Sequence, residues 1–447
     1  MTFTEEQIAQ LAPKPNAFQA GKKLSPKAKW DSFGHSEEAL WGAIRGSGSK
    51  PYLTRIDLQD LAYKCSCPSR QFPCKHALAL MLLMADEGKG SPASTPPEWV
   101  EDWLETRRNR NTPKAAPSKA TTTPADLERK KKAQQKRQEA RIKSVDAGVD
   151  ELSQWLHDLM RVGLLELPEK THDLEQMAAR MVDAKASGLA GRLKSLAYMG
   201  YNQPEVWQPS AMAQLGKLHT LLEAWKNREK FSSEWQLSLK NLIGWPQSGK
   251  DLMDNAEAFA LKDHWLVLGQ ELSYMDELVI QRIWLWGCHT STPAFVLNFG
   301  TVFAPLENKI LAGTIIDADV AFFPGAIRQR AIIRKQFDVS NEMAHQLKGF
   351  ESWQAILEKQ AEQIATNPWL EQQQYILHEA RITAVDGSWM IIDSANKLMP
   401  IVSTFDVERC LQWRMISGQQ TADLAFVMRE NEVLPLGIYH NRAYHLL

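Results

Sequence analysis

The twelve-residue stretch Cys65-Ser66-Cys67-Pro68-Ser69-Arg70-Gln71-Phe72-Pro73-Cys74-Lys75-His76 holds three thiols and one imidazole. A structural zinc ion takes four sulfur or nitrogen ligands in a tetrahedron, and this stretch supplies that number. On a strand, Cys65 and Cys67 point to the same face, and two prolines bound a stiff loop that returns Cys74. His76 then lies in the first turn of a following helix. The spacing predicts one structural Zn²⁺ bound by Cys65, Cys67, Cys74 and His76.

Two alternatives to a structural zinc are weaker. Four protein ligands leave no coordination position for water, which disfavours a catalytic zinc. Four ligands at zinc-compatible spacing also disfavour a chance gathering of buried thiols and a core histidine. Three thiolates and Zn²⁺ sum to one negative charge, and Lys64, Arg70 and Lys75 are placed to offset it.

The segments around this stretch predict a small sheet followed by a helix. Residues 40–45 and 52–57 are candidate strands joined by the turn-forming sequence at 46–51, and residues 62–67 are a candidate third strand. Residues 76–85 are rich in helix-forming side chains. Such a ββα module buries little apolar surface, so metal binding should supply part of its folding free energy.

The pair Cys-x-Cys followed by Cys-x-His resembles the SWIM zinc finger, over roughly residues 50–85. The stretches Ala39-Leu40-Trp41-Gly42, Gly46 to Tyr52 and Arg282 to Gly287 extend the resemblance to bacterial SWIM zinc finger family proteins. The resemblance implies zinc binding together with DNA binding or protein–protein interaction. It also names two candidate partners, because some bacterial members accompany MoxR-like ATPases and von Willebrand factor A-type proteins.

Composition favours a folded, multidomain protein. The chain has 447 residues, 44% of them hydrophobic, which is ordinary globular usage and enough for several domains. Five cysteines form an odd, sparse set that does not suit a disulfide framework. Glu5 and Glu6 stand where a secretory signal would carry positive charge. The longest apolar run, residues 77–85, is shorter than the roughly 20 residues that span a bilayer. We therefore expect a cytoplasmic protein with no membrane partner.

The near-neutral total charge conceals a basic segment. Residues 106–143 hold 13 Lys and Arg against 3 Asp and Glu, and residues 144–447 carry an acidic excess. One interpretation is a phosphate-tracking surface, with anion or nucleic-acid contacts from Lys130, Lys131, Lys132, Lys136 and Arg137. The other interpretation is a solvated helix face and a flexible tether. No aromatic residue interrupts the basic run of residues 129–143, so base stacking there is not predicted.

The remaining periodicities complete the expected fold. A helix should begin at Thr123-Pro124 and run to about residue 165, with an apolar seam at Ile142, Val145, Val149, Leu152, Leu156 and Leu159. Further helices are expected at 174–185, 189–199, 211–225 and 234–243. Strands are expected at 265–268, 278–286, 295–303, 310–316, 328–333, 379–383, 388–393 and 398–403, with a helix at 341–365.

These patterns predict a multidomain α+β protein. Its parts are a zinc-stabilised ββα (SWIM) module at 1–105, a basic linker with the start of a polar helix at 106–143, a helical bundle at 144–260 and a β-rich α+β region at 261–447. The function expected is non-enzymatic recognition or adaptor binding of protein or DNA. The alternative is an enzyme of unrecognised type in the C-terminal region, with the zinc finger as a targeting module and His264, His289 and His378 as candidates.

Several catalytic patterns are incomplete. Residues 244–251 resemble a phosphate-binding loop, but Asp251 stands where Ser or Thr should hold Mg²⁺. His378-Glu379 lacks the second histidine of a zincin helix. Cys288-His289 has no companion ligand nearby in the sequence, and Cys288 and Cys410 are expected to be small buried hydrophobes. Trp155, Trp225, Trp235 and Trp286 are expected to fill cores or seams between domains, and some to line a partner groove.

Overall fold

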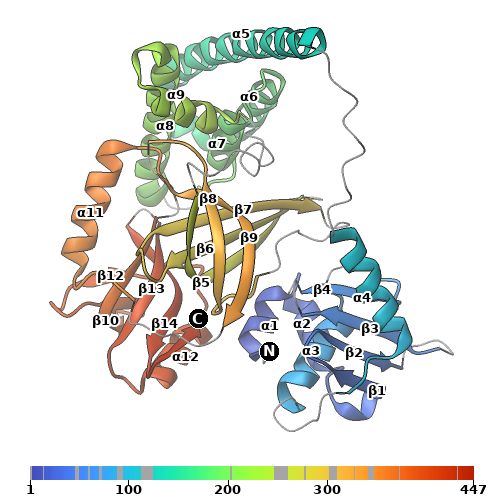
Figure 1. Cartoon of the computed structure of the whole chain (residues 1–447). Helices are drawn as coiled ribbons and strands as arrows, with labels where there is room; N and C mark the ends of the chain where they lie inside the picture. Colours follow the sequence, from blue (N-terminus) through green and yellow to red (C-terminus); the bar gives the residue numbers. More distant parts are fainter. Residues whose placement is uncertain are drawn as a thin grey trace.

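The computed structural model describes residues 3–13, 15–45, 50–58, 61–69, 73–87, 94–111, 124–201, 204–245, 260–275, 278–301, 310–326, 328–340, 347–371, 373–429 and 431–447. An N-terminal sheet with helices, a helical bundle and a C-terminal β-rich region follow one another along the chain (Figure 1). The expected multidomain α+β class is confirmed. Among the described residues, no helix is both long enough and apolar enough to cross a bilayer.

The N-terminal module is built on an antiparallel sheet in the order β1-β2-β3-β4. Its strands are β1 (Trp30–His35), β2 (Ala39–Ile44), β3 (Tyr52–Asp57) and β4 (Ala62–Cys65). The strands expected near 40–45, 52–57 and 62–67 are confirmed, although β4 ends at Cys65. The sequence WDSFGH of β1 holds only two large apolar residues, so its pattern does not predict a strand.

Helices cover both faces of this sheet. Leu40 and Ile44 of β2 join the core under the first three helices, and Ala39 and Trp41 pack against Val100 on the opposite face. Burial from both sides explains why β2 is apolar without alternation. The helices are α1 (Glu5–Leu11), α2 (Pro15–Lys22), the short 3₁₀ helix η1 (Lys27–Lys29), α3 (Lys75–Glu87) and α4 (Glu98–Asn111).

Helix α4 occupies the residues where the linker was expected to begin. Residues 106–111 lie in this helix, and residues 112–123 fall outside the described part of the chain. The Arg55 guanidinium lies 5.1 Å from the Trp99 ring centroid and 5.6 Å from that of Trp103. Cation–π contacts of this kind hold the helix to the sheet despite its polar composition.

The helical bundle packs around the expected seam of α5 (Pro124–Val162). Val145, Val149, Leu152, Leu156 and Leu159 are each 3% exposed or less, which confirms that seam from Val145 onward, whereas Ile142 is only half-buried and lies outside the core. The other α-helices match their expected positions within several residues, whereas two short 3₁₀ helices were not expected. They are the 3₁₀ helix η2 (Leu164–Lys170), α6 (Thr171–Asp183), α7 (Ser187–Ala197), α8 (Pro204–Lys226), the 3₁₀ helix η3 (Arg228–Lys230) and α9 (Ser233–Ile243).

The C-terminal region begins with a closed barrel in the order β5-β6-β7-β9-β8. Its strands are β5 (Ala260–Met275), β6 (Leu278–Gly287), β7 (Pro293–Thr301), β8 (Ile315–Phe322) and β9 (Arg330–Ser340). Trp265, Ile283, Val296 and Ile316 belong to the core cluster inside it. Barrel closure depends on a parallel pairing of β7 with β9 and an antiparallel pairing of β5 with β8, which local periodicity does not predict.

A second sheet follows, in the order β12-β11-β10-β13-β14-β15. Asp386 and Gly387 both have positive φ, as the two-residue hairpin turn between β10 and β11 requires. The helix expected at 341–365 begins later, at Trp353, and residues 341–346 lie outside the described part. The elements are α11 (Trp353–Thr366), β10 (Gln373–Val385), β11 (Ser388–Ile392), β12 (Leu398–Pro400), α12 (Val407–Ser417), β13 (Ala422–Arg429), β14 (Glu432–His440) and β15 (Ala443–Leu446).

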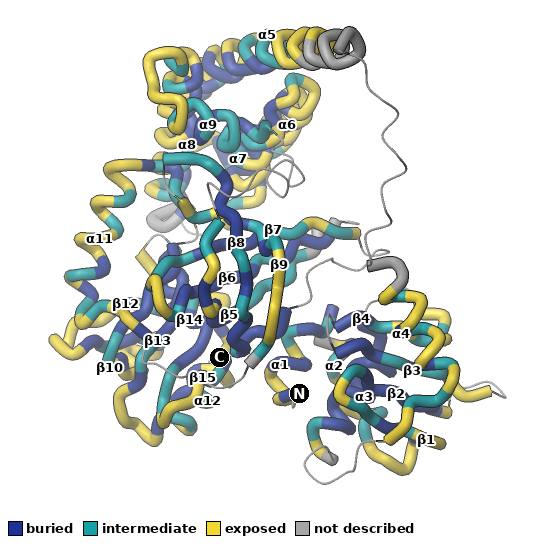
Figure 2. The backbone as a smooth tube through the Cα atoms, viewed as in Figure 1, coloured by how far each residue is buried: buried dark blue, intermediate teal, exposed yellow. Residues whose placement is uncertain are grey.

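Buried residues lie in the interior of each part of the molecule (Figure 2), and side-chain contacts join these parts. The Gln7 side chain of α1 donates to the Ala312 carbonyl, 3.0 Å away in the C-terminal region. Trp369 packs on the bundle core, and its Nε1 donates to the Lys217 carbonyl at 2.7 Å. The Trp235 ring meets the Trp369 ring edge-on at 6.2 Å, so Trp235 fills a seam between domains, as expected.

Candidate metal centre and basic helix

The four predicted zinc ligands converge. The ligand atoms of Cys65, Cys67, Cys74 and His76 all lie within 4.8 Å of one another. Cys65 Sγ and His76 Nδ1 are 3.7 Å apart, close to the spacing of about 3.6 Å that Zn–S and Zn–N bonds give in a tetrahedron. Because β4 ends at Cys65, Cys67 reaches the site from the turn after the strand, not from the shared strand face that the sequence suggested. Cys74 and His76 come from the start of α3.

The site is shielded on the helix side and supported by the sheet. Cys74 is 4% exposed and His76 is 5% exposed, whereas Cys65 and Cys67 are half-buried. Thr54 Oγ1 lies 3.1 Å from Cys65 Sγ, and the Tyr52 ring lies 5.0 Å from the His76 ring. Sequence analysis missed both neighbours, although the strand register that pairs Thr54 with Cys65 could have indicated the first.

The structure adds a cation, Arg55, to those expected to offset the charge of the site. The side chains of Lys64 and Lys75 are exposed, and Arg70 lies outside the described residues. Arg55 is the cation that interacts electrostatically with Cys65. Burial lowers the pKa of the Arg55 guanidinium, and attraction to Cys65 partly opposes that effect. A cation held by Trp99 and Trp103 thus lies near enough to Cys65 to interact with its charge.

Contacts among the three thiols shift their pKa values in opposite directions. Hydrogen bonding with Cys74 lowers the pKa of Cys65 to about 3 and that of Cys67 to about 6, against the opposing effect of burial. The same two contacts, together with burial, raise the pKa of Cys74. Zinc binding would displace the protons that remain on these sulfurs. The donor set of three sulfurs and one nitrogen, at tetrahedral spacing and partly buried, is consistent with one structural zinc.

Helix α5 has two halves with different surroundings (Figure 1). Its C-terminal half carries the buried seam, and Lys132, Lys136 and Arg137 of its N-terminal half are exposed. The side chains of Lys130 and Lys131 lie outside the described residues. Arg141 is not available for phosphate, because its guanidinium lies 4.5 Å from the Trp245 ring centroid and donates to the Lys185 carbonyl.

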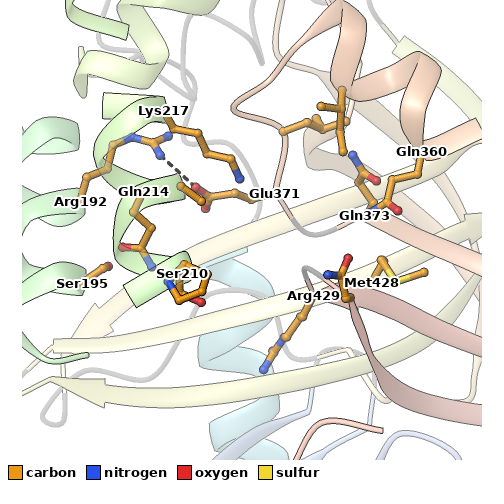
Figure 3. A pocket seen from close by; sticks show the side chains of 15 residues that line it. Arg192, Ser195, Ser210, Gln214, Lys217, Gln360, Glu371, Gln373, Met428 and Arg429 are labelled. Carbon is orange, nitrogen blue, oxygen red and sulfur yellow. Dashed lines mark hydrogen bonds and ion pairs between the residues drawn. The ribbon is translucent and has the colours of Figure 1, made fainter. Parts of the chain in front are cut away.

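A cavity of about 650 Å³ lies between the bundle and the C-terminal region (Figure 3). Arg192, Gln214 and Lys217 of the bundle face Glu371 and Gln373 across it, and Arg192 Nη1 binds Glu371 Oε1 at 3.2 Å. Sequence analysis offers no signal for this cavity, because its walls come from segments distant in the chain.

The histidines of the enzyme alternative do not form one site. His264 and His289 come together beside Asp263, with ring centroids 5.1 Å apart. His378 lies instead on β10, 3.1 Å from Asp423. Burial raises the pKa of both Cys288 and Cys410 to about 11, which fits their expected role as inert hydrophobes. Of residues 244–251, the structure describes two, and Gly244 ends α9 with a φ of 96°.

Comparison with known proteins adds two matches. A family model for the SWIM zinc finger matches residues 52–84, which run from β3 through the four ligands into α3. A model for the SWIM-associated four-helix bundle domain matches residues 140–243, so the basic start of α5 lies outside both matches. Neither the curated proteins nor the solved structures contain a match to the chain. The chain therefore carries a SWIM zinc finger followed by a SWIM-associated four-helix bundle domain.

Proposed function

We propose that this protein is a non-enzymatic recognition or adaptor module whose partner is DNA or another protein. The observation that carries the proposal is the basic start of α5, where Lys132, Lys136 and Arg137 are exposed and precede the residues that form the bundle core. Residues 124–143 hold eight basic and three acidic side chains. A bundle core whose first residue in α5 is Val145 does not explain this excess of charge, whereas a polyanionic partner does.

In this proposal, the zinc ion has a structural role and takes no part in catalysis. Its four protein ligands fill a tetrahedron and leave no position for a reacting water. Zinc would therefore hold β3, β4 and α3 together as a rigid surface. Recognition needs such a surface more than it needs a reactive metal.

The cavity between the bundle and the C-terminal region also fits a non-enzymatic role. The enzyme alternative requires a cleft in which carboxylates or histidines converge. Among the described lining residues, Glu371 is the one carboxylate, it is bound to Arg192, and no histidine is present. This lining favours binding over proton transfer.

The proposal allows two partner classes, DNA and a protein with an acidic surface. DNA would meet the basic helix through its phosphates, without base stacking. An acidic protein surface would meet it through carboxylates. The resemblance to bacterial SWIM proteins names a MoxR-like ATPase or a von Willebrand factor A-type protein as the candidate protein partner.

Fluorescence anisotropy with a labelled DNA duplex tests the DNA version. The affinity of the zinc-loaded chain should fall steeply as salt rises. In a plot of log association constant against log salt concentration, the triple variant Lys132→Gln, Lys136→Gln, Arg137→Gln should reduce the magnitude of the slope by up to about 3. The matched control is Arg161→Gln, Lys194→Gln, Lys230→Gln, which removes three exposed cations from the bundle. Binding that is equal in all three proteins would refute a role for α5. Absence of DNA binding, with partner capture lost in the α5 variant alone, would support the protein version.

A further inference from the structure

His264 and His289 lie together at one rim of the barrel. The β5–β6 ladder pairs Trp265 with Gly287, which brings the residues on either side of that pair close in space. The two imidazole rings are 5.1 Å apart, and the ligand atoms of Asp263, His264 and His289 lie within 4.8 Å of one another. Both histidines are exposed, with 55% of the His289 side chain accessible to solvent. Two imidazoles are thus presented to solvent at a spacing that one metal ion can bridge after a small adjustment.

Asp263 lies beneath them as a buried carboxylate whose side chain is 1% exposed. Its Oδ1 accepts hydrogen bonds from the His264 and His289 backbone N–H groups and from His289 Nδ1, which is 2.7 Å away. Its Oδ2 accepts two more hydrogen bonds, from the N–H and the hydroxyl of Thr290. A carboxylate with this many donors is better suited to holding a ligand than to serving as one.

The contact between Asp263 and His289 determines which ring nitrogen of His289 carries the proton. A carboxylate that accepts from Nδ1 places the proton there and leaves Nε2 as the nitrogen that carries the lone pair. Histidines that bind metal usually donate their other ring N–H to a carboxylate or carbonyl in this way. Asp263 therefore sets both the tautomer and the orientation that a metal-binding His289 requires.

We propose that His264 and His289 form a second metal site, specific for a borderline divalent transition metal such as Ni²⁺, Cu²⁺ or Zn²⁺. Two imidazole donors suit these ions and do not suit Mg²⁺ or Ca²⁺, which prefer oxygen ligands. Asp263 is the positioning residue of the site. Asp317 is directly opposite His264 in the β5–β8 ladder, so its carboxylate adds negative charge on the same face, next to Lys262. With two protein ligands, the ion keeps positions open for water or another ligand, unlike the closed Cys65–His76 centre.

Calorimetric titration with Ni²⁺ of the untagged full chain, loaded with one equivalent of Zn²⁺ so that the second site stays empty, tests this proposal. Filling the zinc centre first keeps its sulfurs from binding the probe. We expect the wild-type chain to bind Ni²⁺ at one site, and His264→Gln and His289→Gln each to weaken binding at least tenfold. Asp263→Asn should weaken binding by about 10- to 100-fold with both histidines still present. His172→Gln, which removes another exposed histidine, should bind like the wild type.

Two results would overturn the proposal. One is a wild-type chain that binds no Ni²⁺ at millimolar concentration. The other is binding that persists unchanged in His264→Gln and His289→Gln. Both histidines are exposed, so their variants should fold, and circular dichroism confirms this before titration. The two histidine variants therefore decide the proposal even if Asp263→Asn fails to fold.

Discussion

Thr54 Oγ1 lies 3.1 Å from Cys65 Sγ, across the ladder in which these two residues of β3 and β4 are partners. The hydroxyl is buried with Thr54, which is 0% exposed. A hydrogen bond from outside the ligand set orients a thiolate and tunes its basicity. The sheet thus takes part in the zinc centre without supplying a ligand to it from β3.

Thr54→Val should therefore weaken zinc binding while preserving the shape of the side chain. Loss of such a contact typically costs 10- to 100-fold in metal affinity, and we expect at least a tenfold rise in the zinc dissociation constant. Competition with a chromophoric chelator measures it. Thr106→Val is the control, since that exposed hydroxyl in α4 bonds to the Asp102 carbonyl, away from the zinc ligands. Equal affinities in both variants would show that the Thr54 hydroxyl does not support Cys65.

Gly188 of α7 lies against the backbone at the C-terminal end of α9. A Cβ at this position would lie 2.2 Å from the Leu242 carbonyl oxygen and 2.8 Å from the Gly244 nitrogen. Gly188→Ala should destabilise the bundle by about 1–3 kcal/mol, because backbone must move to make room. Gly191→Ala, in the same helix and with open space around it, should instead stabilise by about 0.5–1 kcal/mol. Urea unfolding measures both, and equal effects would contradict the packing of α7 against α9.

Trp369 couples the bundle to the C-terminal region through its ring and its N–H. Trp369→Ala removes a ring that is 6% exposed and should cost about 3–5 kcal/mol. Trp369→Phe keeps an aromatic ring but loses the hydrogen bond to the Lys217 carbonyl, and should cost about 1 kcal/mol. Thermal unfolding with limited proteolysis measures the two effects. A Trp369→Ala variant as stable and as resistant as the wild type would mean that this seam contributes little.

Asp263 should make stability depend on pH in the acid range. Burial opposes ionisation of this carboxyl group, but hydrogen bonds from Thr290 and His289 outweigh burial and lower its pKa. A carboxyl whose pKa is lowered on folding stabilises the protein above its unfolded pKa of about 3.9, and that contribution is lost as pH falls through the folded value. The stability lost in Asp263→Asn should thus be largest near neutral pH and shrink below about pH 4. A stability difference that stays constant down to pH 2 would contradict this charge state.

The sequence predicts those features whose determinants are local. The four zinc ligands lie within one short stretch, and the spacing of Val145, Val149 and Leu152 indicates both the helix and its buried face. Helix α4 shows the limit, since Glu98–Asn111 is so polar that linker composition conceals the few residues that pack on the sheet.

The remaining features depend on pairings between distant segments. Strands were expected at 310–316 and 328–333, but β8 and β9 lie at 315–322 and 330–340, where they pair with β5 and β7 as well as with each other. The elements α12, β13, β14 and β15 are not predicted at all. The sequence places His264 and His289 25 residues apart, and Asp263 gives no sign of its role until β5 pairs with β6. The cavity beside Arg192 likewise exists only once the bundle meets the C-terminal region.

The central claim is that Cys65, Cys67, Cys74 and His76 hold one structural zinc ion, and metal analysis of the purified chain tests it most directly. Zinc content is measured by mass spectrometry on a common His289→Gln background, so that the second site does not contribute. The chain and its Cys288→Ser control should each retain one zinc, while Cys67→Ser and Cys74→Ser should retain much less. Equal, stoichiometric zinc in all four proteins would contradict the assignment.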